Sequence, residues 1–124
     1  MKPIVLMVGV EKVLHRYLSL LFKTNNIDLK IAGNEEEASQ WLKKNSPDLV
    51  ITEFMPMPTA SYIQKNSESL EKVSKVPFIV ITSCEQEIER YLTEPLMKAD
   101  IIQMPFSPLG FMDKVKKAIS NRTH

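Results

Sequence analysis

The stretch "DLVITEFMPMP", residues 48–58, places an acid at the end of an apolar run. Residues 49–52 are apolar or β-branched in succession, a pattern typical of a strand that is buried on both faces. Glu53 follows, and then comes a loop that holds two prolines and two methionines. Because proline fixes the backbone and lacks an amide donor, the loop is expected to be rigid. The stretch therefore predicts a buried strand that carries one carboxylate to its tip.

Four further short apolar runs flank this strand in the sequence. Residues 4–8 and 78–82 form strong runs, and residues 29–31 and 101–104 form weaker ones. Between the first two strands, apolar side chains recur at offsets of three and four, which predicts one face of a helix: Leu14, Tyr17, Leu18, Leu21 and Phe22. His15 falls on the polar side of that helix. The runs and their spacing predict five strands.

Helical patterns separate the remaining strands. Asn34 followed by Glu37 resembles a capping box and predicts the start of a second helix. Residues 61–74 predict a third helix, and a fourth over Ile88, Tyr91 and Leu92 is expected to end or kink at Pro95. Ser107 before a proline predicts the cap of a last amphipathic helix. Strand and helix thus alternate five times.

Such alternation favours a doubly wound α/β domain, in which a parallel sheet carries helices on both faces. Ligands and chemistry then collect at the carboxyl ends of the strands. The residues expected at this rim are Gly9, Val10, Glu11, Glu53, Thr82, Ser83, Met104 and Pro105.

Composition narrows the class of protein. The 124 residues suit a single domain, residues 1–124, and 44% hydrophobic content suffices for a core. A formal net charge of +1 gives no field that would attract nucleic acid or an anionic membrane. The single cysteine, Cys84, excludes an internal disulfide, and no apolar run approaches the roughly 18 residues of a membrane span. These features predict a cytoplasmic protein that binds neither nucleic acid nor membrane directly.

The order and spacing of five segments resemble the receiver domain of two-component response regulators. The segments are "IVLMV", "NEEEASQWL", "PDLVITE", "VPFIVITS" and "ADIIQMPFSP", and together they span essentially the whole chain. The resemblance implies a flavodoxin-like receiver fold with five helices and the strand order 2-1-3-4-5. It also implies a cis peptide bond between Met104 and Pro105.

The same resemblance assigns roles to the rim, and several positions depart from the family pattern. Glu53 stands where the family has a phosphoacceptor Asp, and Thr82 stands where it has a switch hydroxyl. Gly9 and Val10 replace the acidic pair that holds magnesium, and Met104 replaces the lysine that contacts the phosphoryl group. Phosphoryl transfer relies on charge neutralisation and positioning, so these losses predict a pseudo-receiver that is not an enzyme and needs no cofactor.

The sequence alone leaves open the role of Glu53 and two alternatives to the pseudo-receiver function. Glu53 either mimics a phosphorylated aspartate, with a hydrogen bond from Thr82, or is a solvated relic. A receiver that still accepts a phosphoryl group, with weak magnesium binding through Glu11 and Glu53, is the second functional reading. A flavodoxin-like domain for an anionic cofactor is a third, although the loops lack a glycine-rich phosphate cradle.

The expected partner is another signalling protein, either a histidine kinase, an output domain or a further regulator. In the family, partners bind the face made by the fourth helix, fifth strand and fifth helix, and a homodimer through this face is an alternative. The resemblance places that face at residues 86–120, and its expected contact residues are Tyr91, Ile102, Gln103, Phe106 and Phe111.

Overall fold

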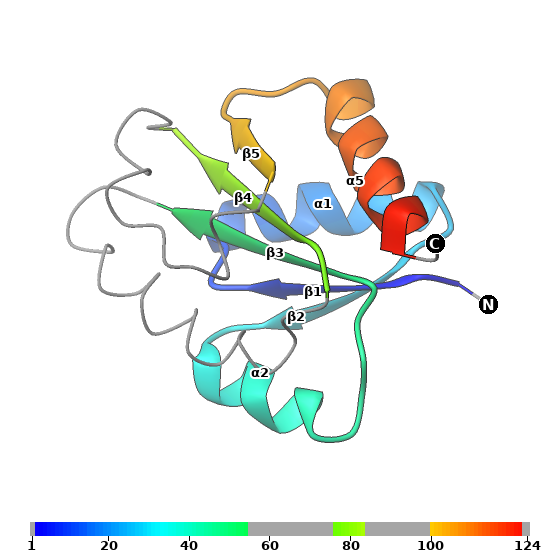
Figure 1. Cartoon of the computed structure of the whole chain (residues 1–124). Coiled ribbons are helices and arrows are strands. Elements are labelled where there is room, and N and C mark those ends of the chain that lie inside the picture. The colour runs from blue at the N-terminus through cyan, green and yellow to red at the C-terminus, as the bar shows by residue number, and fades with distance from the viewer. Residues whose placement is uncertain (1, 55–75, 84–99, 123–124) are drawn as a thin grey trace.

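A computed structural model describes residues 2–54, 76–83 and 100–122 of the chain (Figure 1). The elements run in the order β1 (Ile4–Val8), α1 (Lys12–Thr24), β2 (Asp28–Ala32), α2 (Glu35–Leu42), β3 (Leu49–Phe54), β4 (Phe78–Thr82), β5 (Asp100–Gln103) and α5 (Pro108–Arg122). The expected helices over residues 61–74 and near Ile88 lie outside the described residues.

The strands form one five-stranded parallel sheet in the order β2-β1-β3-β4-β5, as the resemblance implied. Side chains of successive strand residues point to opposite faces of the sheet, so each strand contributes to two hydrophobic cores, one on each face. Val5 and Met7 of β1 pack on the side of α1 and α5, whereas Leu6 and Val8 pack on the side of α2. Figure 1 shows α2 on one face of the sheet and both α1 and α5 on the other. The described helices therefore cover both faces.

Side-chain caps fix the starts of two helices, as the sequence predicts. Asn34 Oδ1 accepts the backbone N–H of Glu37 at 2.9 Å, and the Glu37 carboxylate accepts the N–H of Gly33 at 2.9 Å. The return bond thus reaches one residue before the cap of α2. Ser107 Oγ accepts the N–H of Gly110 at 3.0 Å at the start of α5. These bonds satisfy amide groups that have no partner within their helices.

The strand β3 is longer than the apolar run predicts. It extends to Phe54, and its last two residues pair with Ile81 and Thr82 of β4. Glu53 is therefore part of the sheet, whereas the sequence places it just past the strand. The longer strand follows from backbone pairing, because β4 continues to Thr82 and pairs with residues 50–54 of β3.

Candidate functional site

Parallel pairing brings the ends of β1, β3 and β4 to one rim of the sheet. Val8 pairs with Thr52, so the loop after β1 starts beside Glu53. The backbone N–H of Met104 donates to the carbonyl of Thr82 at 2.7 Å, which draws the loop after β5 to the same rim. The peptide bond between Met104 and Pro105 is cis, which confirms the expectation from the resemblance. The rim positions named from the sequence are thus neighbours in space.

Glu53 is buried at this rim and its carboxylate has a backbone partner. Only 4% of the residue is exposed, and Oε1 accepts the N–H of Glu11 at 2.8 Å. Glu11 is the residue that caps α1, and its own side chain makes no capping bond. The carboxylate of β3 therefore holds the loop after β1 at the start of α1. This placement corrects the reading of Glu53 as a solvated relic.

The pKa of Glu53 is raised above the usual value of 4.5. Burial is the largest cause, since it disfavours the charged form, and the nearby Glu11 carboxylate acts in the same direction. The hydrogen bond from the Glu11 backbone and the field of His15 oppose the shift. The environment thus favours the neutral acid more than water does, which is unfavourable for a nucleophilic carboxylate.

His15 takes part in the same arrangement, contrary to the expectation that it lies on a polar surface. Its side chain is half-buried, and Nε2 lies 2.7 Å from the carbonyl oxygen of Val10. A carbonyl only accepts, so this bond requires the ring proton on Nε2. The loop after β1 is therefore bonded from two sides, by Glu53 at Glu11 and by His15 at Val10.

The described side chains at the rim do not supply the donor set of a magnesium site. Magnesium requires about six oxygen ligands, usually including one or more carboxylates. Gly9 has no side chain, Val10 is apolar and only 7% exposed, and the Glu11 side chain is exposed. Within residues 2–54, 76–83 and 100–122, no three His, Cys, Asp or Glu side chains are grouped as a metal site requires. The described side chains at the rim therefore do not fit a magnesium ion.

The two threonines and Met104 complete the rim. Thr82 is fully buried at the end of β4, and Met104 is half-buried and packs against the core on the α1 and α5 side. Thr52 is 1% exposed, and its hydroxyl has no hydrogen-bond partner among the described residues. No ammonium group is contributed by position 104, so the side chain there cannot neutralise an anion.

Two of the five expected partner-contact residues are buried instead. Ile102 is 5% exposed and Phe111 is 1% exposed, and both belong to the core. Phe111 packs edge-on against Phe22 of α1, with ring centroids 5.9 Å apart, and stacks on Phe106 at 4.8 Å. Phe111 is buried because α5 packs its apolar side chains onto the sheet. Tyr91 lies outside the described residues.

The other two expected contact residues reach the surface. Gln103 is exposed, and its amide donates to the carbonyls of Ser83 at 2.8 Å and Met104 at 3.2 Å. Phe106 is half-buried, and its ring lies 6.2 Å from that of Tyr17 on α1. Among the described residues of this face, Gln103 and Phe106 are therefore the expected contacts that a partner could reach.

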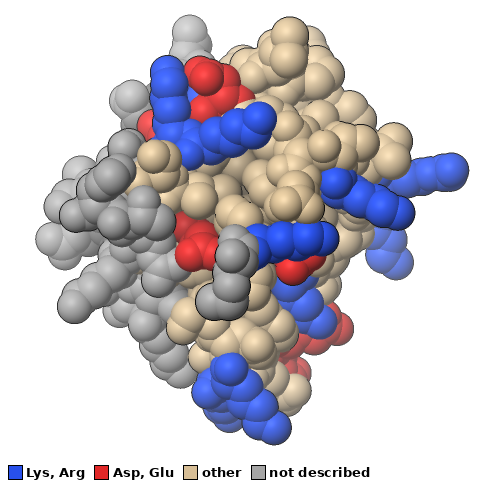
Figure 2. Space-filling model, turned by 90° about the vertical axis from the view of Figure 1, so that its right-hand side faces the viewer, with Lys and Arg blue, Asp and Glu red and all other residues tan. Residues whose placement is uncertain are grey.

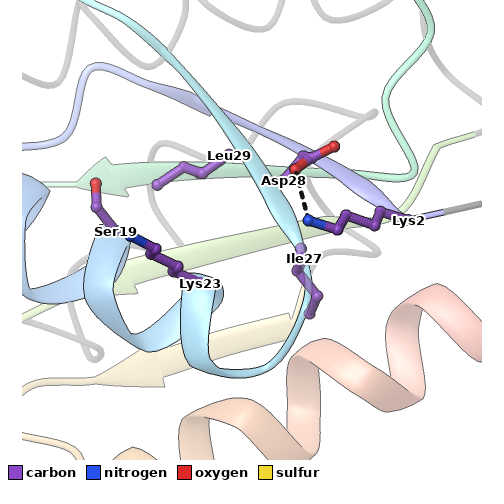
Figure 3. Close-up of a pocket in the computed structure, with 6 residues that line it drawn as sticks. All are labelled: Lys2, Ser19, Lys23, Ile27, Asp28 and Leu29. Carbon is purple, nitrogen blue, oxygen red and sulfur yellow. Dashed lines mark ion pairs between the residues drawn. The ribbon is translucent and has the colours of Figure 1, made fainter.

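A hollow of about 220 Å³ lies at the β2 edge of the sheet, between β2 and α1 (Figure 3). Lys2 and Asp28 face each other there at 3.9 Å, with both side chains more than half exposed. Lys23 and Ser19 of α1 line the other side. The hollow carries both signs of charge and shares no residue with the rim around Glu53.

No protein-family model matches the sequence. The transcriptional regulatory protein CpxR homolog of Haemophilus influenzae is 32% identical to the chain over 111 residues. The aligned residues cover 90% of this chain and 48% of that protein, so the chain spans about half the length of this curated relative.

Solved structures of receiver domains superpose on nearly the whole chain. The signal receiver domain of an HD domain-containing protein from Pseudomonas fluorescens has a TM-score of 0.80 at 16% identity, and covers 99% of this chain and 98% of its own. The Francisella response regulator 1452 receiver domain has a TM-score of 0.72 at 22% identity, with 97% and 98% covered. The chain therefore has the fold of response-regulator receiver domains.

A third solved structure with this fold holds a metal ion. The receiver domain of a sensor histidine kinase from Pseudomonas aeruginosa has a TM-score of 0.74 at 14% identity and covers 97% of this chain and 99% of its own. That protein has a magnesium ion coordinated in its active-site cleft. In the present chain, no helix among the described residues has the length and hydropathy to cross a membrane.

The sequence alone missed two features of this site. It placed Glu53 at the rim but did not identify the Glu11 backbone as its partner, because that contact joins residues 42 apart in the chain. It also placed His15 on the solvent side of α1. The available signal was the spacing of Glu11 and His15, which lie one helical turn apart at the start of a helix next to a buried acid.

Replacing Glu53 with Gln is expected to stabilise the domain at pH 7 relative to the wild type. A carboxyl group whose folded pKa is raised favours folding at low pH, and its contribution is lost as pH rises from about 4.5 through the folded pKa. Gln does not titrate, and its side-chain oxygen can still accept the Glu11 N–H. The difference in the free energy of unfolding between Glu53→Gln and the wild type should therefore shrink as the pH falls below 4.5.

Urea unfolding followed by circular dichroism between pH 4 and pH 8 measures this effect. Glu36→Gln, which removes an exposed carboxylate on α2, controls for the loss of one negative charge. A Glu53→Gln domain that is less stable than the wild type at pH 7 would contradict the expected sign.

Proposed function

We propose that this receiver domain is a pseudo-receiver: a protein-interaction module of two-component signalling that works without phosphoryl transfer, bound metal or enzymatic activity. The observation that carries the proposal is the hydrogen bond of 2.8 Å from the Glu11 backbone to the buried Glu53 carboxylate. The position that would accept a phosphoryl group serves instead to hold the loop after β1.

Three features at the rim support this proposal. Burial raises the pKa of Glu53 and so reduces the fraction that can act as a nucleophile. The Glu11 N–H also occupies one of the two carboxylate oxygens, Oε1. Finally, Gly9, Val10 and Met104 offer neither metal ligands nor a cation for the charge that develops in phosphoryl transfer.

The side chain at position 53 also has the wrong length for the reaction. Glu places its carboxylate about one carbon–carbon bond further from the strand than Asp does, and displacements near 1 Å can cost about 100-fold in rate. Here the extra length allows the carboxylate to reach the backbone of Glu11. Thr82 then has no phosphoryl group to sense, and we propose that it acts as a buried strand residue.

The proposed partner is another signalling protein, such as a histidine kinase, an output domain or a second regulator. Of the expected contact residues that the structure describes, Gln103 and Phe106 are at least partly exposed. We propose a role in the cytoplasm as one receiver unit, residues 1–124, because the resemblance spans the chain. Transcriptional regulation is named for the Haemophilus relative, of which the chain covers 48%.

Incubation with acetyl phosphate and magnesium tests the proposal, with intact-protein mass spectrometry as the readout. The wild-type domain is expected to show no added phosphoryl group, with or without magnesium. An active receiver domain treated in parallel provides the positive control. Magnesium-dependent addition that disappears in Glu53→Gln would overturn the proposal and favour the alternative, in which Glu11 and Glu53 bind magnesium weakly.

A further inference from the structure

Strand β2 lies at one edge of the sheet and has β1 as its neighbour. The N–H of Asp28 donates to the chain just before β1 at 2.9 Å, and the carbonyl of Ala32 accepts from the residue just after β1 at 3.5 Å. Because successive strand residues alternate in direction, the N–H and carbonyl groups of Leu29 and Ile31 point away from β1. Among the described residues, no strand pairs with these groups, which we call the outer edge of β2.

The hollow of about 220 Å³ between β2 and α1 opens beside this outer edge (Figure 3). Leu29 lines the hollow and also belongs to the outer edge, while Ser19 and Lys23 of α1 form the opposite wall. A strand added to β2 would lie about 4.8 Å away, with its side chains alternating between the two faces of the sheet. A side chain on the α1 face can therefore enter the hollow.

Positive charge predominates around the outer edge. Lys23 stands in the hollow and Lys30 is exposed on the other face of β2, and neither takes part in an ion pair among the described residues. Lys2 pairs with Asp28 at 3.9 Å, with both side chains more than half exposed, so that pair is weak. Figure 2 shows the end of the molecule at which β1 begins, where Lys and Arg side chains project from the surface. The outer edge therefore favours a partner with carboxylates.

The lysine at the centre of β2 disfavours pairing with a second copy of this chain. Two β2 strands paired antiparallel about a two-fold axis would bring the two Lys30 side chains opposite each other, and like charges in that position are destabilising. Lysine on an edge strand commonly prevents such self-association. The same side chain attracts a segment of another protein that carries a carboxylate at this place. Charge thus distinguishes between the possible occupants of the outer edge.

We infer that the outer edge of β2 binds an extended acidic segment of another protein, which adds a strand to the sheet. Main-chain hydrogen bonds to Leu29 and Ile31 supply affinity, and the side chains supply specificity. Adjacent acids of the added strand point to opposite faces, so one carboxylate meets Lys23 in the hollow and the next meets Lys30. The surface lies at the opposite edge of the sheet from β5, and its occupation does not depend on phosphoryl transfer at the rim.

The length of β2 sets the length of the probe. Its five residues extend about 17 Å at 3.3 Å per residue. A blocked peptide of about six residues, built from valine and threonine with two adjacent glutamates at its centre, matches this length and places one carboxylate on each face. One control peptide has lysines in place of the glutamates. The other keeps the glutamates but has N-methyl groups on its backbone nitrogens, so it cannot donate main-chain hydrogen bonds.

Amide hydrogen exchange of the ¹⁵N-labelled domain reports on the direction of each N–H. Without peptide, the amides of Leu29 and Ile31 should exchange fast, because they face solvent. Saturating glutamate peptide is expected to slow both at least about tenfold. The amides of Asp28 and Lys30 point towards β1 and should change little. Neither control peptide should slow the exchange, and the affinity for the glutamate peptide should fall as salt rises.

A double variant of the domain tests the two lysines. Lys23→Gln/Lys30→Gln is expected to weaken binding of the glutamate peptide about fivefold, because each exposed ion pair contributes a small part of the affinity. Its Tm should match the wild type, since both side chains are exposed. Lys114→Gln/Lys117→Gln is the matched control, because it removes two charges from exposed positions of α5. This control should leave the affinity unchanged.

Each other outcome overturns the inference. Equal binding of the lysine peptide would contradict the charge selection, and slowed exchange with the N-methylated peptide would contradict strand addition. Slow exchange of Leu29 and Ile31 without peptide would show that the outer edge is already occupied, by a second copy if sedimentation shows a dimer. Unchanged exchange with the glutamate peptide would reject the outer edge as a docking site, whereas the acetyl phosphate experiment tests the proposed function separately.

Discussion

Replacing Phe111 with Ala is expected to lower the free energy of unfolding by about 3–5 kcal/mol. Phe111 is 1% exposed and lies between the rings of Phe22 and Phe106, at centroid distances of 5.9 and 4.8 Å. Its removal loses the transfer free energy of the ring and leaves a cavity between α1 and α5. Urea unfolding followed by circular dichroism measures the loss.

The control for this variant lies two residues earlier on the same helix. Leu109→Ala removes a side chain that is 86% exposed and is expected to change the free energy of unfolding by less than about 0.5 kcal/mol. An equal loss of unfolding free energy in Phe111→Ala and Leu109→Ala would contradict the placement of Phe111 in the core. Loss of partner binding by Phe111→Ala with unchanged stability would instead restore Phe111 as a contact residue.

The second large effect is expected from rebuilding an ion site at the rim. The triple variant Val10→Asp/Glu53→Asp/Met104→Lys supplies two short carboxylates and an ammonium group. The wild type has one longer carboxylate and two apolar side chains at these positions. Magnesium should stabilise this variant by about 2.7 kcal/mol at a concentration 100-fold above its Kd. The shorter side chain at position 53 should also release the Glu11 N–H, which leaves an oxygen free for the cation.

The readout is the change in stability on adding magnesium at constant ionic strength. Without the ion, the triple variant should be less stable than the wild type, because Val10 is only 7% exposed and an unpaired charge there is costly. The matched control, Val10→Asn/Glu53→Asn/Met104→Lys, keeps the shapes but removes both carboxylates. Equal magnesium stabilisation of this control or of the wild type would contradict the account of the rim.

The sequence predicts the sheet better than it predicts the ends of its strands. Alternating strand and helix patterns indicate a parallel α/β fold, and the resemblance supplies the observed strand order. The run at residues 49–52 ends too early because hydropathy treats Glu53 as a break. Backbone pairing with Ile81 overrides that break, since main-chain bonds do not depend on the side chain. Strand ends thus require knowledge of the neighbouring strand.

In the candidate site, the sequence located the rim positions but not the contacts between them. Rim positions such as Glu53 and Met104 follow from the motif order, because parallel strands end at one edge. The partner of Glu53 does not follow, since it is a backbone group contributed by the loop after β1. The burial of Phe111 was also missed, because periodicity identifies an apolar face without showing whether that face meets the sheet or a partner protein.

The most direct measurement is a magnesium titration of the ¹⁵N-labelled wild-type domain, followed through the amide signals of Glu11, Glu53 and Met104. The bond between Glu53 and the Glu11 backbone joins two of these residues. The third, Met104, stands at the position where the resemblance to receiver domains implies a lysine. We expect no saturable shift at millimolar magnesium. Saturable shifts of all three signals together would contradict the pseudo-receiver account.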